Sequence, residues 1–246
     1  MLTIDINCDM GEGIGNDEAI MPFITSANIA CGYHAGDEEI MKQTVESAIK
    51  HNIAIGAHPS FLDRENFGRT DMHLPNNEIY DLLTAQISLL EKVAIGSGMQ
   101  LHHVKPHGAL YNMAARNNKM AAIICLAIKD VNVELVVYGL SGSHLITEAK
   151  KIGLKAASEV FADRTYQDNG SLTPRTSANA LIEGQDNAVF QALQMITQKR
   201  VTSVNGKDIP IVADTICIHG DGKNAVGFAK TIHQNLKQNN IDIKAI

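Results

Sequence analysis

Acidic, imidazole and cationic side chains follow six apolar runs of the chain, each close to the point where the run ends. A carboxylate or an imidazole can move a proton, and a lysine or an arginine can hold an anion. These candidates are Asp9, Glu12, His34, Asp37, His58, Arg69, Lys105, His107, Glu159, His219 and Asp221, together with the neutral amide of Asn7. Loops are polar in general, so any one of them could be an ordinary loop residue. The recurrence of His and Asp, where Ser or Asn would serve a loop equally well, favours one shared site.

The elements that must hold these side chains are short apolar runs that alternate with longer stretches of helical periodicity. The predicted strands cover 2–8, 26–31, 53–57, 101–105, 133–138, 154–159 and 213–218. The predicted helices cover 36–51, 76–97, 117–130, 142–152, 177–199 and 222–239. In the helix at 76–97, apolar residues recur at a spacing of three to four, which is typical of a helix with one face against a core.

This alternation predicts right-handed βαβ units and a parallel sheet. Seven or eight units within 246 residues favour an α/β fold, a single irregular TIM-like (β/α) barrel with about seven parallel strands that forms one domain over 1–246. An open doubly wound sheet is the alternative. Asn205-Gly206 between two apolar runs predicts an antiparallel hairpin near 201–212, and 241–246 is a candidate eighth strand. In a barrel, the carboxyl ends of the strands meet on one face, which would gather the candidate side chains.

Four of the ten histidines follow predicted strand ends, namely His34, His58, His107 and His219. Asp9 with His34, His58 or His107 could hold a divalent metal with an open coordination position. Proton transfer without a metal explains the same residues, and no HExxH or CxxC spacing decides between the two. The other histidines are expected elsewhere, His51, His73, His144 and His233 at the surface and His102 and His103 in packing roles within a strand.

A loop that would cradle the phosphates of ATP is not evident in the sequence. The Gly222-Lys223 pair has Cys217 where a phosphate-binding loop has its first glycine. The glycine run at 11–15 is only loosely similar to a dinucleotide fingerprint, and the acidic residues around it would repel a phosphate. The G-x-S-x-G pattern of a serine hydrolase is also missing.

Composition argues against several classes of partner. The 21 basic and 27 acidic residues give a net charge of −6, which weighs against nucleic acid, and 4% aromatic residues without Trp leave few groups for base stacking. No apolar run approaches the length of a membrane-spanning helix, and the N-terminus lacks a basic leader. The four cysteines are widely spaced, which is typical of a cytoplasmic protein with reduced thiols. We therefore expect a small-molecule substrate, with no nucleic acid and no membrane.

Eight segments of the chain resemble the LamB/YcsF family. They are DINCDMGEG at 5–13, NIACGYHAGD at 28–37, GAHPSF at 56–61, FGR at 67–69, HVKPHGALYN at 103–112, SEVFADRTY at 158–166, LTPR at 172–175 and CIHGD at 217–221. In this order they are specific to the family, and together they span nearly the whole chain. The resemblance implies an irregular (β/α) barrel similar to the glycoside-hydrolase and polysaccharide-deacetylase barrels.

The resemblance also implies a reaction. It predicts a hydrolase component, the A subunit of a prokaryotic 5-oxoprolinase, that helps to open 5-oxo-L-proline (pyroglutamate) to L-glutamate with hydrolysis of ATP, together with separate subunits B and C. The missing phosphate loop then indicates that ATP is used through these partners, while this chain acts on the activated product. Two alternatives stay open. One is a stand-alone metal-dependent amidase or deacetylase of the same barrel superfamily, and the other is a component that only binds substrate or scaffolds the complex.

Opening a lactam requires delivery of water, stabilisation of an anionic centre and a proton for the ring nitrogen. We expect four catalytic residues, with Asp9 as the base or its orienter, His58 or His107 as the proton shuttle, and Lys105 as an anion stabiliser. The residues expected to bind substrate are Asn7, Glu12, His34, Asp37, Arg69, Glu159, His219 and Asp221.

Overall fold

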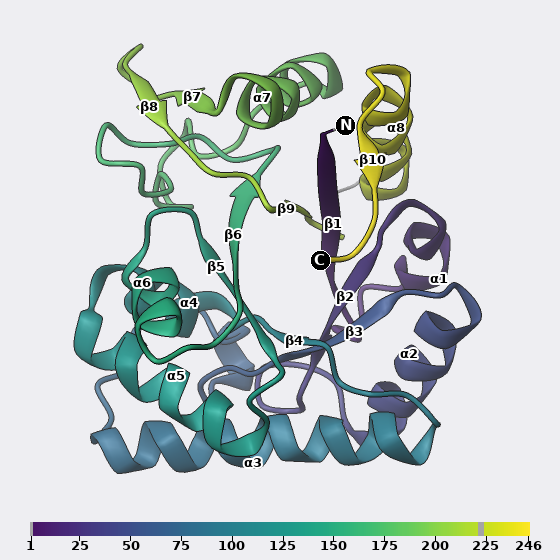
Figure 1. The fold of residues 1–246 in the computed structure, drawn as a ribbon, viewed down its shortest axis with the longest axis vertical. Helices are drawn as coiled ribbons and strands as arrows, with labels where there is room; N and C mark the ends of the chain where they lie inside the picture. Colours follow the sequence, from purple (N-terminus) through teal and green to yellow (C-terminus); the bar gives the residue numbers. More distant parts are fainter. Residues whose placement is uncertain (1, 221–223) are drawn as a thin grey trace.

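Seven parallel strands follow one another around a closed ring (Figure 1). The structure is a computed structural model that describes residues 2–220 and 224–246. The strands of the ring are β1 (Thr3–Met10), β2 (Ser26–Ala30), β3 (Ala54–His58), β4 (His103–Val104), β5 (Val136–Leu140), β6 (Ala156–Phe161) and β9 (Thr215–Ile218). Because β1 pairs with both β2 and β9, the sheet closes on itself. The predicted (β/α) barrel is confirmed, and the open doubly wound sheet is excluded.

Helices surround this ring and cover the outward faces of the strands (Figure 1). They are α1 (Asp17–Ile20), α2 (Glu38–Lys50), α3 (Asn76–Gly96), α4 (Gly108–Arg116), α5 (Asn118–Val131), α6 (His144–Lys151), α7 (Gln185–Gln198) and α8 (Ala225–Gln238), with short 3-10 turns at Met21–Phe23 and Arg64–Asn66. Within the described residues, no helix is long and apolar enough to cross a membrane.

Two helices differ from the sequence-based prediction. The prediction did not include α4, which begins two residues after Pro106 and is too short to show a clear period. The helix predicted at 177–199 begins only at Gln185, because Gly184 has a φ of +89° and the preceding residues form a loop. That loop closes through isolated bridges such as Arg164 to Leu181.

The two predicted additions to the barrel are both present. Strands β7 (Arg200–Thr202) and β8 (Asp208–Pro210) pair in antiparallel fashion around the Asn205-Gly206 turn. The last strand, β10 (Asp242–Ile243), pairs in parallel with the beginning of β1.

The interior of the barrel is polar. Alternate residues of β1 carry Asp5, Asn7 and Asp9, and their apolar neighbours in the strand are buried against the rest of the core. Asn28 on β2 donates to Asn7 Oδ1 at 2.8 Å and to Asp9 Oδ1 at 2.8 Å. His103 on β4 contacts Asn28 Oδ1 at 2.9 Å. A column of hydrogen bonds therefore runs inside the barrel toward the carboxyl ends of the strands.

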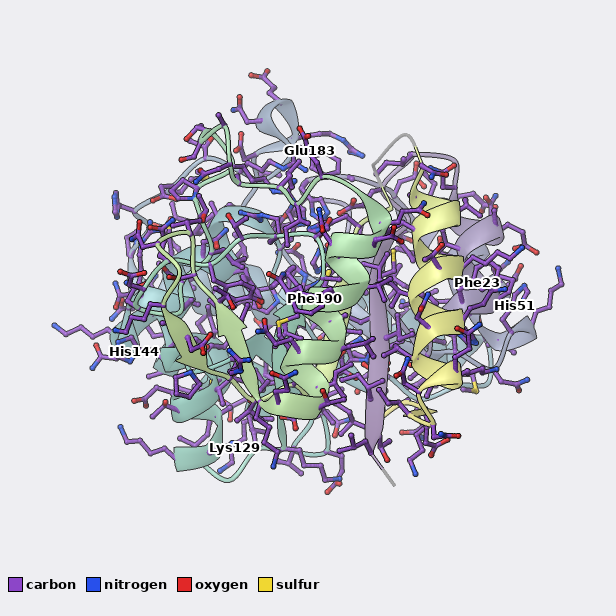
Figure 2. All side chains as sticks on the ribbon, turned by 90° about the horizontal axis from the view of Figure 1, so that it is seen from above. Phe23, His51, Lys129, His144, Glu183 and Phe190 are labelled. Carbon is purple, nitrogen blue, oxygen red and sulfur yellow. The ribbon has the colours of Figure 1, made fainter. Side chains whose placement is uncertain are left out.

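The histidines predicted to lie outside the site either lie away from the hydrogen bonds inside the barrel or pack against the residues that form them. Figure 2 shows His51 and His144 at the periphery of the molecule. Of the adjacent pair in β4, only His103 enters the barrel, where its ring stacks on Tyr138 with a centroid separation of 4.2 Å. His102 is half-buried and contacts the backbone oxygen of Ile246.

The ring of His103 occupies the space that a side chain on residue 56 of β3 would fill. Gly56 leaves this space open, because a Cβ at this position would lie 2.1 Å from His103 Nε2. We expect Gly56→Ala to lower the free energy of unfolding by about 1–3 kcal/mol, since the ring cannot move without losing its contact with Asn28. Gly96→Ala is the matched control, because no atom lies within 4 Å of the added Cβ at the end of α3. Urea unfolding compares the two variants, and equal stability of both would contradict this packing.

Candidate active site

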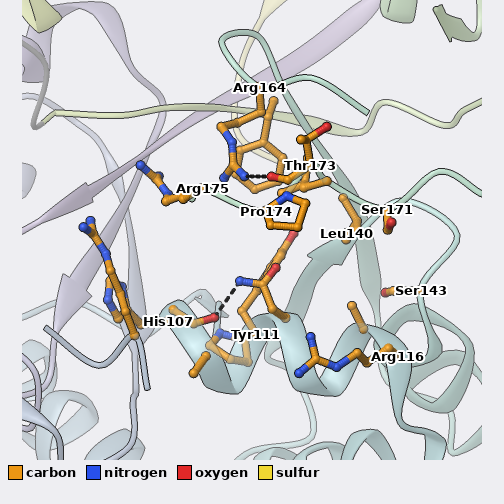
Figure 3. Close-up of a pocket in the computed structure, with 18 of the residues that line it drawn as sticks. His107, Tyr111, Arg116, Leu140, Ser143, Arg164, Ser171, Thr173, Pro174 and Arg175 are labelled. Carbon is orange, nitrogen blue, oxygen red and sulfur yellow. Dashed lines mark hydrogen bonds between the residues drawn. The ribbon is translucent and has the colours of Figure 1, made fainter. Parts of the chain in front are cut away.

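The carboxyl ends of the barrel strands open into a cavity of about 1030 Å³, at the upper end of the usual range for ligand sites. Figure 3 shows part of its wall, with Tyr111 and Arg116 on α4 and with Thr173 and Arg175 on the loop that follows β6. Predicted site residues line it at seven positions, Asp9, Glu12, His58, Arg69, Lys105, His107 and His219.

A buried lysine joins two carboxylates at the floor of this cavity. Lys105 Nζ lies 3.0 Å from Asp9 Oδ1 and 2.8 Å from Glu159 Oε1. The hydroxyl of Tyr111 donates to Glu159 Oε2 at 2.5 Å. Burial by itself would lower the pKa of Lys105, but the negative charges of Asp9 and Glu159 outweigh it and hold this pKa well above its usual value. The lysine is therefore a permanent cation that draws β1, β4 and β6 together.

Asp9 is held by one carboxylate oxygen and presents the other to a histidine. Its Oδ1 accepts from Lys105 and from Asn28, while its Oδ2 lies 3.3 Å from His58 Nε2. Burial alone would raise the pKa of Asp9, but the charges of His58 and Lys105 and a hydrogen bond from His58 keep it well below its usual value. Asp9 is consequently ionised at neutral pH and positioned by its neighbours.

Three imidazole rings and one carboxylate meet beside Asp9. The rings of His34 and His107 stack with centroids 3.8 Å apart, and the ring of His58 stands edge-on to both. Burial and the charge of His58 lower the pKa of His34 to about 3, and the same two causes lower the pKa of His107. Glu12 Oε1 lies 3.1 Å from His34 Nε2. Three rings and a carboxylate whose side chain is nearly buried thus share one small space.

The far nitrogen of each ring is fixed by an acceptor. A backbone carbonyl cannot donate, and the Ser60 hydroxyl already donates to the Phe61 carbonyl at 2.9 Å, so each ring nitrogen that meets one of these acceptors carries the proton. The contacts are His58 Nδ1 to Lys105 O at 2.7 Å, His107 Nε2 to Phe67 O at 2.9 Å and His34 Nδ1 to Ser60 Oγ at 2.9 Å. The opposite nitrogens, which face one another, therefore present lone pairs when the rings are neutral.

The loop after β3 supplies one of these acceptors through an unusual backbone conformation. Phe67 has a φ of +56°, in the left-handed region that a bulky residue enters at a cost of about 1–3 kcal/mol. This conformation accompanies the contact of its carbonyl with the ring of His107. The guanidinium of Arg69 lies 5.0 Å from the centre of the Phe67 ring and lines the cavity.

This cluster could hold a metal ion. Glu12, His34, His58 and His107 each offer one ligand atom, and these atoms all lie within 4.8 Å of one another. The sequence predicted Asp9 with His34 and His58. His107 was an alternative in that prediction. In the structure the three histidines form a group with Glu12, and Asp9 lies beside it, with Oδ2 3.3 Å from His58 Nε2.

Asn7 and Asp37 do not line the cavity, and His219 lines it away from the histidine cluster. Asn7 lies inside the barrel, one layer below the cavity, and accepts from Lys105 at 3.1 Å. Asp37 is not among the residues that line the cavity, since its exposed side chain caps the N-terminus of α2. His219 lies on the wall, where it contacts Asp163 at 2.8 Å and Arg175 at 2.7 Å. Asp221 falls outside the described residues.

Four further residues shape the site and were not singled out from the sequence. They are Asn28, Ser60, Phe67 and Tyr111, which hold Asp9, His34, His107 and Glu159 respectively. All four lie within the segments that carry the family resemblance, so membership of those segments was the available signal. Their residue types alone gave none, because asparagine, serine and aromatic residues are common in loops and cores.

Fold and site together define a (β/α)-barrel protein with an acid–base site at the carboxyl ends of its strands. Residues 4–246 match the LamB/YcsF family, and the chain belongs to that family.

Named relatives match over the full length. The chain is 52% identical over 250 residues to the 5-oxoprolinase A subunit of Brevibacillus brevis, covering 100% of this chain and 98% of the relative. It is 49% identical over 251 residues to the protein of the same name from Tolumonas auensis, covering 100% of both. The crystal structure of a lactam utilization protein from Thermus thermophilus aligns with a TM-score of 0.93 and 36% identity, covering 100% of each chain. The T48 deacetylase aligns with a TM-score of 0.53 and 11% identity over 98% of this chain and 87% of that one, which shows a shared fold alone.

Proposed function

We propose that this chain is the A subunit of a 5-oxoprolinase, a hydrolase that opens 5-oxo-L-proline to L-glutamate with ATP and two partner subunits, B and C. The observation that carries the proposal is the full-length likeness, in both directions, to proteins named as this component of 5-oxoprolinase. The site supports it, because it combines an ionised carboxylate, a buried cation and three imidazoles in one cavity.

The five-membered ring of 5-oxoproline is a stabilised amide, so its carbonyl carbon must be activated before water can attack. A base must then take a proton from the water, and an acid must protonate the ring nitrogen.

Asp9 is the base in this proposal, because it is ionised and directs Oδ2 away from Lys105. Lys105 positions Asp9, since Nζ already contacts Asp9 and Glu159. Arg69 on the cavity wall is suited to the carboxylate or a phosphate of the substrate.

The histidines connect Asp9 with the rest of the cluster. His58 Nε2 lies 3.3 Å from Asp9 Oδ2 and 2.8 Å from His107 Nδ1. A proton at His58 can therefore pass to either neighbour, which supports the shuttle expected of His58 or His107. Two facing ring nitrogens at 2.8 Å need a positive group between them, which is the shuttled proton when no metal ion is bound there.

ATP fits the partner subunits better than this chain. The glycine run at 11–15 leads into α1, whose first turn carries Asp17 and Glu18, and a helix start with two acids repels phosphate. We therefore assign phosphorylation of the lactam to the partners and hydrolysis of the activated ring to this cavity. The buried cysteines of the described chain are all free thiols, which supports the cytoplasm as the place of action.

A reconstitution assay tests this division of labour. We expect the purified chain to release little glutamate from 5-oxo-L-proline, with or without ATP, because the amide is not activated. Addition of subunits B and C together with ATP should restore turnover. The measurement is glutamate release in parallel with phosphate release, and the control omits each component in turn.

Three results would contradict the proposal in different ways. Turnover by the chain alone without ATP would identify a stand-alone amidase. Turnover by the chain alone that needs ATP would place the nucleotide on this chain. Acetate release from an N-acetylated sugar, without any cleavage of 5-oxoproline, would identify a deacetylase.

A further inference from the structure

We propose that Glu12, His34, His58 and His107 bind one divalent transition-metal cation of the zinc type at the mouth of the barrel. The inference concerns the cation site and holds whichever substrate the cavity takes. Imidazole nitrogens with one carboxylate oxygen form a donor set that suits zinc and its neighbours in the first transition row.

The hydrogen bonds behind the rings support this assignment. The outer nitrogen of each ring donates to a fixed acceptor, the carbonyl of Lys105, the carbonyl of Phe67 or the hydroxyl of Ser60. Metal-bound histidines are held in this way, because an acceptor behind the ring fixes the tautomer and aims the lone pair at the metal. The four ligand atoms, three ring nitrogens and Glu12 Oε1, thus lie within 4.8 Å of one another, and the ring of His34 must tilt out of its parallel stack on His107 for both lone pairs to reach one ion.

Protons satisfy this arrangement poorly. The contact of His58 Nε2 with His107 Nδ1 at 2.8 Å needs one proton, and the contact of His34 Nε2 with Glu12 Oε1 at 3.1 Å needs another. The second proton must be bound either by Glu12, which would then be a neutral acid, or by the ring of His34, which is stacked on the ring of His107. One divalent cation satisfies all four atoms at once, without charging any ring.

The separations of the four atoms match a small cation. Four tetrahedral ligands at about 2.0–2.1 Å from zinc lie about 3.3 Å from one another. Four of the six separations are 2.8 Å between His58 Nε2 and His107 Nδ1, and 3.1, 3.4 and 3.9 Å from Glu12 Oε1 to His34 Nε2, His107 Nδ1 and His58 Nε2, and all six are within 4.8 Å. These values scatter on both sides of the tetrahedral edge, and a tilt of the His34 ring away from its parallel stack on His107 would bring the four atoms around one ion.

Charge and access point the same way. Asp9 and Glu12 each place a carboxylate oxygen within 4 Å of a ring nitrogen of the cluster, so a cation bound there would meet negative charge as well as lone pairs. Glu12, His58 and His107 line the cavity, so the cation would be open to a substrate on that side. Bound there, it would act as a Lewis acid for a carbonyl or carboxylate oxygen, and Asp9 beside it would remain to take the proton.

Metal binding to the whole chain tests the proposal. The protein is stripped with a chelator and titrated with Zn²⁺ or Co²⁺, and stoichiometry, affinity and melting temperature are measured. We expect one equivalent of bound metal, a rise in melting temperature and a Co²⁺ absorption band typical of nitrogen and oxygen ligands. Ser60→Ala, which removes only the acceptor behind His34, should weaken the affinity about 10–100-fold. Glu12→Gln and His107→Gln should weaken it further.

His219→Gln is the matched control, because this histidine lines the same cavity but contacts Asp163 and Arg175 instead of the cluster. It should bind Zn²⁺ with unchanged affinity. Absence of stoichiometric binding by the wild-type chain would overturn the proposal, as would full affinity in Glu12→Gln and His107→Gln. If those two variants do not fold, full affinity in the folded Ser60→Ala variant overturns it. A failure of the 5-oxoproline assay leaves these measurements unaffected, so the two proposals can fail separately.

Discussion

We expect Asp9→Asn to lower glutamate release by the assembled enzyme about 10²–10⁴-fold while the melting temperature stays close to that of the wild type. Asparagine keeps the size of the side chain and an acceptor oxygen for Lys105 and Asn28, but it removes the charge and the basic oxygen that lies 3.3 Å from His58. The measurement is the rate of glutamate release from 5-oxo-L-proline with both partner subunits and ATP, together with thermal melting of each variant.

Asp37→Asn is the control for this prediction. The sequence placed both aspartates in the site, but Asp37 caps α2 from an exposed position, and asparagine caps a helix about as well as aspartate. We therefore expect wild-type turnover and stability from Asp37→Asn. Near-normal turnover of Asp9→Asn would instead reduce Asp9 to a turn residue and move the base to His58 or His107.

Lys105→Met should affect both stability and activity. Methionine fills a similar volume but leaves Asp9 and Glu159 as buried carboxylates without their cation. Removing one partner of a buried ion pair costs about 3–5 kcal/mol, which corresponds to a decrease in melting temperature of about 6–20 °C for a chain of this size. Turnover should fall to background, because Lys105 holds the base in place. Calorimetry and the glutamate assay measure the two effects.

A second substitution separates the two effects of Lys105→Met. In Lys105→Met the carboxylate of Glu159 is buried without its cation, and adding Glu159→Gln removes this charge. The double variant should therefore regain part of the lost stability and none of the turnover. The surface control is Lys155→Met, which breaks an exposed pair with Glu134 and should cost less than about 1 kcal/mol. A Lys105→Met variant as stable as Lys155→Met would show that the buried pair does not stabilise the barrel.

Much of the fold was predictable from the sequence, because periodicity reports which faces of a segment are buried. The helix predicted at 76–97 is α3, and the hairpin around Asn205-Gly206 forms β7 and β8. Errors arose where local signals were weak or ambiguous. The helix at α4 was missed because it follows Pro106 closely, and the start of α7 was placed too early in a loop that only long-range contacts order.

The candidate site was predictable in part. Residues at or directly after the end of a strand, such as Asp9 near the end of β1 and His107 after β4, reach the cavity. Asp37 does not, because the chain has already turned by that point and its side chain caps the next helix. Asp9 lies within β1 and His107 three residues after β4, whereas Asp37 lies seven residues after β2, so the distance from the strand end separates the two cases once the strand bounds are known.

The sequence by itself determined the family, and it predicted parallel βαβ units with candidate residues near the strand ends, because these follow from local patterns and ordered motifs. The structure decided that the sheet closes into a barrel, because β1 pairs with both β2 and β9. Only the tertiary structure decided that Lys105 lies between Asp9 and Glu159, and that Glu12 completes a cluster with three histidines. These partners come from different strands and loops. Their meeting depends on strand order, register and closure of the ring, and the tautomer of each histidine depends on which acceptor the fold places behind its ring.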